Sequence, residues 1–205
     1  MAQKGEQRKK LSRLIELGGT LQEAASGYGA PHGGRRIEAC AAAFLVAGGE
    51  GILAGGPREW VFPAFFDEDG GCTYLEDGRD LGPGGHRGVP GSVLATAGAP
   101  GGQLERGLGA SLAGKDSLVV IGTRSVVDRL PTLVSAPKVT PFVVLAVNEG
   151  GAGEPDAGIV LDMAEAAGWA AHREGGSISE LTSTLRKAWE SRSRGPALIE
   201  WTPGR

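Results

Sequence analysis

The sequence predicts an α/β fold with a mostly parallel sheet and helices on both faces of that sheet. Three segments carry this prediction, because each is apolar apart from Ser117 and Glu200: residues 117–122, 141–147 and 197–201. A strand that is apolar on both faces is typical of a parallel sheet covered from both sides. Segments with helical periodicity separate the three strands, as in alternating α/β folds.

The second half of the chain supplies most of the predicted helices. Helical patterns cover about residues 103–114, a shorter stretch ending at Leu133, and residues 159–169 and 177–192. The last of these helices begins with Ser177 and has Glu180 three positions later. This spacing predicts a capping box, in which the two side chains satisfy two backbone N–H groups that the helix leaves unpaired.

The first half of the chain predicts two helices and little further regular structure. A helical N-terminal segment spans about residues 1–30, with a one-sided apolar stripe over residues 6–28 and a break near Gly18 and Gly19. Residues 36–46 are small and apolar almost all round, which predicts a buried helix. Residues 67–101 are rich in Gly, Asp and Pro without a period, so we expect a functional loop region or disorder there.

Composition indicates one domain over residues 1–205, because 205 residues with 40% apolar content can form a single substantial core. The 36 glycines cluster between the patterned segments, which fits either loops with unusual backbone conformations or the codon bias of a GC-rich genome. A net charge of −3 argues against a nucleic-acid partner. Two cysteines without a CxxC pair or secretory leader, and no apolar run that could span a bilayer, predict a cytoplasmic protein away from membranes.

Three further segments have an order and spacing that are found together in one family. Residues 60–66 read Trp-Val-Phe-Pro-Ala-Phe-Phe, and residues 102–113 form a glycine-rich turn into a helix. The strand that ends at Gly122 is followed 26 positions later by Asn148. Over about residues 36–202 the chain resembles the diphosphate-binding half of thiamine-diphosphate enzymes, namely the alpha subunits of 2-oxoacid dehydrogenases and the amino-terminal domain of transketolase.

The resemblance implies a site for thiamine diphosphate and magnesium. In that family a Gly-Asp-Gly turn and a later Asn supply oxygen atoms to the metal, which requires hard ligands in near-octahedral order. The positions that correspond to cofactor-binding residues are the following: Phe65, Gln103, Gly122, Thr123, Arg124 and Asn148.

Four positions in this implied site depart from the family pattern. Thr123 offers a neutral hydroxyl in place of the metal-binding carboxylate, and Arg124 replaces the second glycine of the turn. Glu149 follows Asn148, and Phe66 stands where the family has an arginine that reaches phosphate. Magnesium diphosphate bound in the familiar manner is therefore not expected. Arg124 either neutralises a diphosphate directly through its guanidinium or is a solvated residue at the start of a short helix.

The resemblance also implies a partner. In the family, the glutamate that activates the aminopyrimidine ring belongs to a pyrimidine-binding domain, and no segment of this sequence resembles that domain. We therefore expect a separate beta-type subunit, within a homo- or hetero-oligomer. The apolar helices at 39–46 and 103–114 are candidates for the contact face and equally for the core of the domain itself.

Two histidines in glycine-rich segments, His32 and His86, are candidate catalytic residues, with solvated loop histidines as the alternative. No motif with metal-binding spacing occurs. Two hypotheses on function remain. In the first, the chain is a small alpha-type subunit of a thiamine-dependent enzyme of two-carbon or acyl transfer. In the second, it no longer runs that chemistry: it is a non-catalytic partner of that lineage, or a domain recruited to a thiamine-independent reaction, for example one that uses His86.

Overall fold

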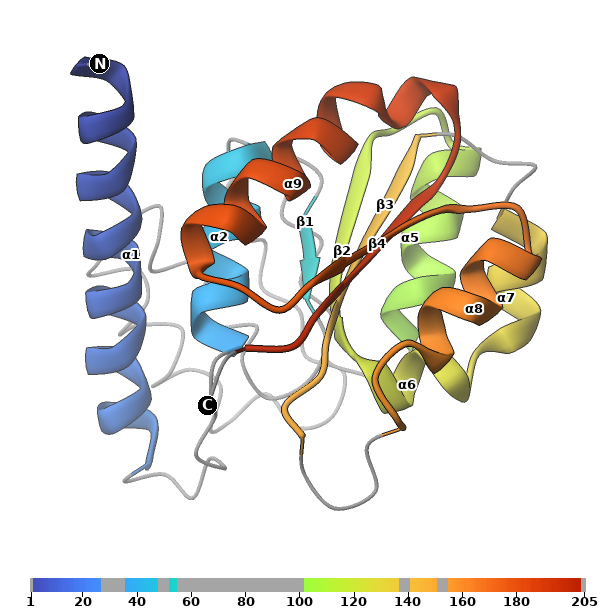
Figure 1. The fold of residues 1–205 in the computed structure, drawn as a ribbon, viewed down its shortest axis with the longest axis horizontal. Coiled ribbons are helices and arrows are strands. Elements are labelled where there is room, and N and C mark those ends of the chain that lie inside the picture. Colours follow the sequence, from blue (N-terminus) through green and yellow to red (C-terminus); the bar gives the residue numbers. More distant parts are fainter. Residues whose placement is uncertain are drawn as a thin grey trace.

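A five-stranded sheet in which all strands are parallel forms the centre of the protein (Figure 1). The computed structural model describes residues 2–26, 36–47, 52–54, 102–136, 141–150 and 155–203. The strands are β1 (Ile52–Ala54), β2 (Ser117–Gly122), β3 (Phe142–Val147), β4 (Ala170–Glu174) and β5 (Ala197–Trp201), in the order β1-β2-β3-β5-β4. Because all strands run the same way, they end at one edge of the sheet, here called the carboxyl edge.

Helices cover both faces of the sheet. Their bounds are α1 (Ala2–Ser26), α2 (Arg36–Ala47), α5 (Gly102–Leu112), α6 (Thr123–Val127), α7 (Leu130–Ser135), α8 (Ile159–Ala166) and α9 (Ile178–Ser191). Figure 1 shows the sheet between two groups of helices, with α2 and α9 on one side, α5 to α8 on the other, and α1 outermost beside α2. The predicted fold class is confirmed.

Two hydrophobic cores follow from the alternation of side chains along the central strands. Val120 of β2 and Leu145 of β3 point towards α2 and α9, whereas Val119 and Val144 belong to the core under α5 and α8. All four side chains are buried. The unbroken apolar sequence of these strands therefore reflects burial on both faces.

Helix α2 lies within the core of the domain. Its small residues from Ala39 to Ala43 are each 2% exposed or less, because α1 and α9 pack against the helix from outside. Of the two interpretations open for this apolar helix, the structure supports the core, and these side chains are not available to a partner.

Helix α5 approaches the sheet closely, and Gly107 permits that approach. A Cβ atom on Gly107 would lie 2.6 Å from Cγ2 of Val119 and would overlap the ring of Phe142. The Ser117 hydroxyl donates a hydrogen bond of 3.0 Å to the carbonyl oxygen of Gly107. At this position glycine is required by packing, which the alternative of codon bias does not explain.

The predicted capping box at the start of α9 is confirmed. The backbone N–H of Glu180 donates to the Ser177 hydroxyl at 3.4 Å, and the backbone N–H of Ser177 donates to the Glu180 carboxylate at 2.7 Å. The hydrogen bonds that the backbone N–H and the hydroxyl of Ser177 donate to the Glu180 carboxylate hold the pKa of this carboxyl below its usual value. Leu181, Leu185 and Ala188 form the buried stripe of this helix at the spacing of an amphipathic helix.

Three expectations from the sequence need correction. The break predicted near Gly18 and Gly19 is wrong, because α1 continues to Ser26. The packing of Leu11 and Leu14 outweighs the cost of a helical glycine, about 1 kcal/mol. The short helical stretch before Leu133 is two helices, α6 and α7, and strands β1 and β4 were not predicted.

The extended segment 60–66 and the loop region 67–101 lie outside the described residues. Within the part of the chain that the structure describes, no helix has the length and apolar character needed to cross a membrane.

Candidate functional site

Four of the residues implied by the resemblance lie at the carboxyl edge, namely Gly122, Thr123, Arg124 and Asn148. β2 and β3 are neighbours, and their register pairs Gly122 with Val147. Thr123 and Asn148, the next residue in each case, therefore follow adjacent strands at the same level. The turn and the asparagine, which are separated by 25 positions in the sequence, are brought together by the parallel pairing.

The turn after β2 leads directly into α6. Gly122 has an extended backbone, with φ of −74° and ψ of 146°, and precedes the helix without a side-chain cap. The Thr123 side chain is fully buried, whereas Arg124 is exposed. The turn thus places a buried neutral hydroxyl and an exposed cation where the family pattern has a carboxylate and a bare backbone.

The Asn148 amide has hydrogen-bond partners on the side of β5. Its Nδ2 donates to Oε1 of Glu200 at 3.3 Å and to the carbonyl oxygen of Pro155 at 3.3 Å. Its Oδ1 accepts from the backbone N–H of Gly150 at 3.0 Å. The side chain is 4% exposed, so these bonds fix the loop that follows β3.

Glu200 is the buried charged group at this edge. It belongs to β5, is fully buried, and accepts a hydrogen bond of 2.7 Å from the backbone N–H of Gly158 at Oε2. Gly158 is the residue that caps the N-terminus of α8. A buried carboxylate needs hydrogen-bond donors to offset its desolvation, and the partial positive charge at the start of a helix adds to them. We call Glu200, Asn148 and Gly158 the Glu200 clamp.

Arg173 lies beside the Glu200 clamp. The register of β4 and β5 pairs Arg173 with Glu200, so both side chains leave the sheet on the same face. Gly158 has a φ of +102°, and a Cβ atom there would overlap the guanidinium of Arg173. The positive φ explains why glycine occupies position 158, whereas the Arg173 guanidinium ends a flexible side chain that could move aside.

Gln103 lies in the first turn of α5, which runs back from the carboxyl edge towards the start of β2. Its side chain is 1% exposed, and its Oε1 has no hydrogen-bond partner among the described residues. A buried polar atom without a partner is uncommon in proteins, so Gln103 stays a candidate site residue at this end of α5.

The connections between the strands change face at the end of β5. The chain leaves β3 for α8 on one face and leaves β4 for α9 on the other, and β5 lies between these two strands. Ligands of open α/β sheets bind at such switch points. Glu200 and Asn148 therefore line the position at which this topology favours a site.

The described residues do not fit magnesium diphosphate in the family manner. Magnesium needs several hard oxygen ligands, usually with at least one carboxylate. At the turn only the Thr123 hydroxyl is offered, and the nearby carboxylate of Glu200 already accepts from Gly158 and Asn148. No group of three His, Cys, Asp or Glu side chains in the described ranges is arranged to hold a metal ion.

Other predicted site residues lie elsewhere in the chain. His32, His86 and Phe65 are outside the described residues. The sequence analysis did not select Glu200 or Gly158. A signal for Glu200 was present, because it is the charged residue within an otherwise apolar strand, Ala-Leu-Ile-Glu-Trp.

Comparison with known proteins finds no matching protein-family model and no curated protein with significant sequence similarity.

Proposed function

We propose that this chain is a diverged small subunit of the diphosphate-domain type, related to the alpha subunits of thiamine-diphosphate enzymes. It acts with a separate pyrimidine-domain subunit and contributes structure to that assembly without holding magnesium diphosphate in the family manner. The observation that carries the proposal is the arrangement of the carboxyl edge. There the turn at Thr123 adjoins Asn148, and the carboxylate of Glu200 accepts hydrogen bonds from Asn148 and Gly158.

The fold supports the lineage. A parallel sheet covered on both faces, with the Gly122 turn and Asn148 at the ends of neighbouring strands, is the arrangement that the family's signature requires. The helix α5, which begins the glycine-rich segment, packs tightly on β2 through Gly107. These features support a common scaffold and are independent of whether a cofactor binds.

The chemistry of the edge supports a partner role over cofactor chemistry. Position 123 holds a buried hydroxyl, which carries no charge to balance a divalent cation. The Arg124 guanidinium adds positive charge at the position where the cation would be needed. A bound metal would therefore meet fewer ligands and more repulsion than in the family.

A second candidate function is favoured by the exposure of Arg124 at the same edge. In that case the guanidinium pairs with a diphosphate directly and replaces the metal by a bidentate contact. The chain would then be a catalytic subunit in two-carbon or acyl transfer with its beta-type partner. Diphosphate binding that persists after removal of magnesium distinguishes this candidate from the first.

The proposal is tested by purifying the native complex and identifying the subunit that co-purifies. We expect a cytoplasmic heteromer whose second chain contains a pyrimidine-binding domain with its glutamate. The complex is then assayed for 2-oxoacid decarboxylation with and without the present chain. A protein that purifies only as a monomer, or with a partner of unrelated fold, overturns the proposal.

A further inference from the structure

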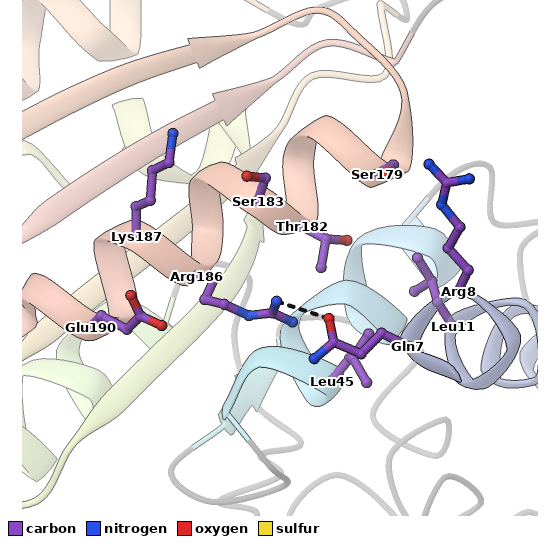
Figure 2. A pocket seen from close by; sticks show the side chains of 10 residues that line it. All are labelled: Gln7, Arg8, Leu11, Leu45, Ser179, Thr182, Ser183, Arg186, Lys187 and Glu190. Carbon is purple, nitrogen blue, oxygen red and sulfur yellow. Dashed lines mark hydrogen bonds between the residues drawn. The ribbon is translucent and has the colours of Figure 1, made fainter. Parts of the chain in front are cut away.

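A groove of about 380 Å³ lies between α9, α2 and the outermost helix α1 (Figure 2). One face of α9 lines it over its length, with side chains at positions 179, 182, 183, 186, 187 and 190. These positions recur at intervals of three and four, so they form a single stripe along the helix. At 1.5 Å per residue the stripe is about 16 Å long, which suits an elongated occupant.

The groove is cationic, although the chain as a whole has a net charge of −3. Arg8 of α1 and Arg186 and Lys187 of α9 line it, against one acidic residue, Glu190. Figure 2 shows Arg186 directed at Gln7, and its Nη1 donates to Oε1 of Gln7 at 3.0 Å. Gln7 is neutral, so that bond does not balance the charge of Arg186, and both Arg8 and Lys187 are exposed.

An apolar contact is available within the same groove. Leu11 of α1 and Leu45 of α2 belong to its lining, and Leu45 is only partly buried. The small side chains of Ser179, Thr182 and Ser183 on α9 permit another backbone to approach closely. The groove therefore combines an apolar floor, small hydroxyl side chains and cationic margins.

We propose that this groove docks an acidic, amphipathic helical segment of a partner protein. Its apolar side chains would contact Leu45 and Leu11, and its carboxylates would pair with Arg8, Arg186 and Lys187. A helix laid along a groove is a common mode of peptide recognition, and complementary charge selects the partner. A symmetric contact with a second copy is disfavoured, because it would place two cationic grooves against each other. This inference does not depend on the proposed function.

The test uses the full-length chain and a fluorescently labelled amphipathic helical peptide that carries Leu on one stripe and Glu beside it. A peptide with Gln in place of each Glu is the control ligand. We expect saturable binding of the Glu peptide, at least about tenfold weaker binding of the Gln peptide, and further weakening as salt is raised. Hydrogen exchange should show protection confined to α9 and the first half of α1.

Charge reversal locates the contact. The pair Arg186→Glu and Lys187→Glu should weaken binding of the Glu peptide by about tenfold or more. The pair Arg8→Glu and Lys187→Glu keeps the bond between Arg186 and Gln7 and should have a similar effect. The matched control pair, Lys115→Glu and Arg194→Glu, changes the net charge equally at exposed positions outside the groove and should leave binding within about twofold.

Three results overturn the inference. They are no saturable binding of the Glu peptide, equal weakening by the groove pairs and the control pair, or binding of citrate and inorganic phosphate in competition with the peptide at equal affinity. The last result would identify a site for small anions.

Discussion

Oε2 of Glu200 accepts a hydrogen bond of 2.7 Å from the backbone N–H of Gly158, a residue 42 positions earlier in the chain. The bond joins the end of β5 to the start of α8, and Oε1 of the same carboxylate accepts from Asn148 after β3. One buried side chain thus connects the segments that follow β3 with the last strand. An internal carboxylate thus organises the carboxyl edge of this sheet.

The Glu200 clamp should contribute measurably to stability. In Glu200→Gln, the amide offers one acceptor oxygen to two donors, so either Gly158 or Asn148 loses its partner in a buried site. A buried donor without a partner costs about 1–3 kcal/mol. Urea denaturation should show a loss of that size in the free energy of unfolding. Glu165→Gln, at an exposed position of α8, is the matched control and should change stability by less than about 0.5 kcal/mol. Equal effects of the two variants would contradict a structural role of the clamp.

Gly107 and Gly109 of α5 should respond oppositely to replacement by alanine. In Gly107→Ala the added Cβ meets Val119 and the Phe142 ring, so α5 must move away from the sheet, at a cost of about 1–3 kcal/mol. In Gly109→Ala the added Cβ meets nothing within 4 Å, and the gain in helix propensity is worth up to about 1 kcal/mol. Thermal denaturation of both variants checks the prediction. A stabilised Gly107→Ala would show that the close approach of α5 is not required.

The capping box of α9 predicts a pH-dependent contribution to stability. The hydrogen bonds from Ser177 lower the pKa of Glu180 in the folded protein. The ionised carboxylate is therefore favoured by folding. Its contribution is fully present above the unfolded value, about 4.3, and is lost as the pH falls through the lowered folded value.

Ser177→Ala keeps the backbone N–H at position 177, which is the larger cause of the lowered pKa, and removes the hydroxyl, so it should remove part of this contribution. The difference in unfolding free energy between wild type and variant should therefore shrink as the pH falls below about 4. Ser193→Ala, at an exposed position after α9, should show a difference that does not change with pH. A wild-type advantage that grows on acidification would contradict the assignment.

Introducing the Asp-Gly turn of the resembled family should produce a gain in thermal stability that depends on magnesium and thiamine diphosphate. In the double variant Thr123→Asp and Arg124→Gly, a carboxylate enters a fully buried position, so the variant without ligand should be less stable than wild type by about 1–3 kcal/mol. Magnesium with thiamine diphosphate should then raise its melting temperature more than that of wild type, because only the variant supplies the charged ligand.

Thr123→Asn with Arg124→Gly is the matched control for that variant, since it alters size similarly without adding charge. Equal responses of both variants to magnesium and thiamine diphosphate would mean that the missing carboxylate is not what separates this chain from the cofactor-binding enzymes that it resembles.

The central strands could be predicted because their environment is uniform. β2 and β5 have the predicted bounds, and β3 agrees with prediction to within one residue, since burial on both faces leaves sequences that are apolar apart from Ser117 and Glu200. Ser177 and Glu180 fixed the start of α9 through local hydrogen bonds that need no tertiary information.

The elements that the sequence analysis missed depend on long-range contacts. β4 is an edge strand whose residues, among them His172 and Arg173, are largely exposed, so its sequence lacks an apolar run. β1 has three residues and is a strand only because it pairs with β2. The continuity of α1 through Gly18 depends on its packing against α2.

Part of the candidate site could be predicted because the strands that carry it could be predicted. Parallel pairing of β2 and β3 follows from the strands, and with it the nearness of Thr123 and Asn148. The role of Glu200 could not be derived from the sequence. Its partner Gly158 is 42 positions earlier in the chain, and only the position of α8 in the fold brings the two together.

The most direct test of the account is a calorimetric titration with thiamine diphosphate, once in the presence of magnesium and once with EDTA. The sample is the wild-type chain together with the partner subunit that the proposed function expects to co-purify. To separate the contribution of this chain, the partner subunit is titrated alone under the same conditions. The account predicts no magnesium-dependent binding that requires this chain. Saturable one-to-one binding with a Kd of about 1 µM or lower, present only in the complex and abolished by EDTA, would contradict it.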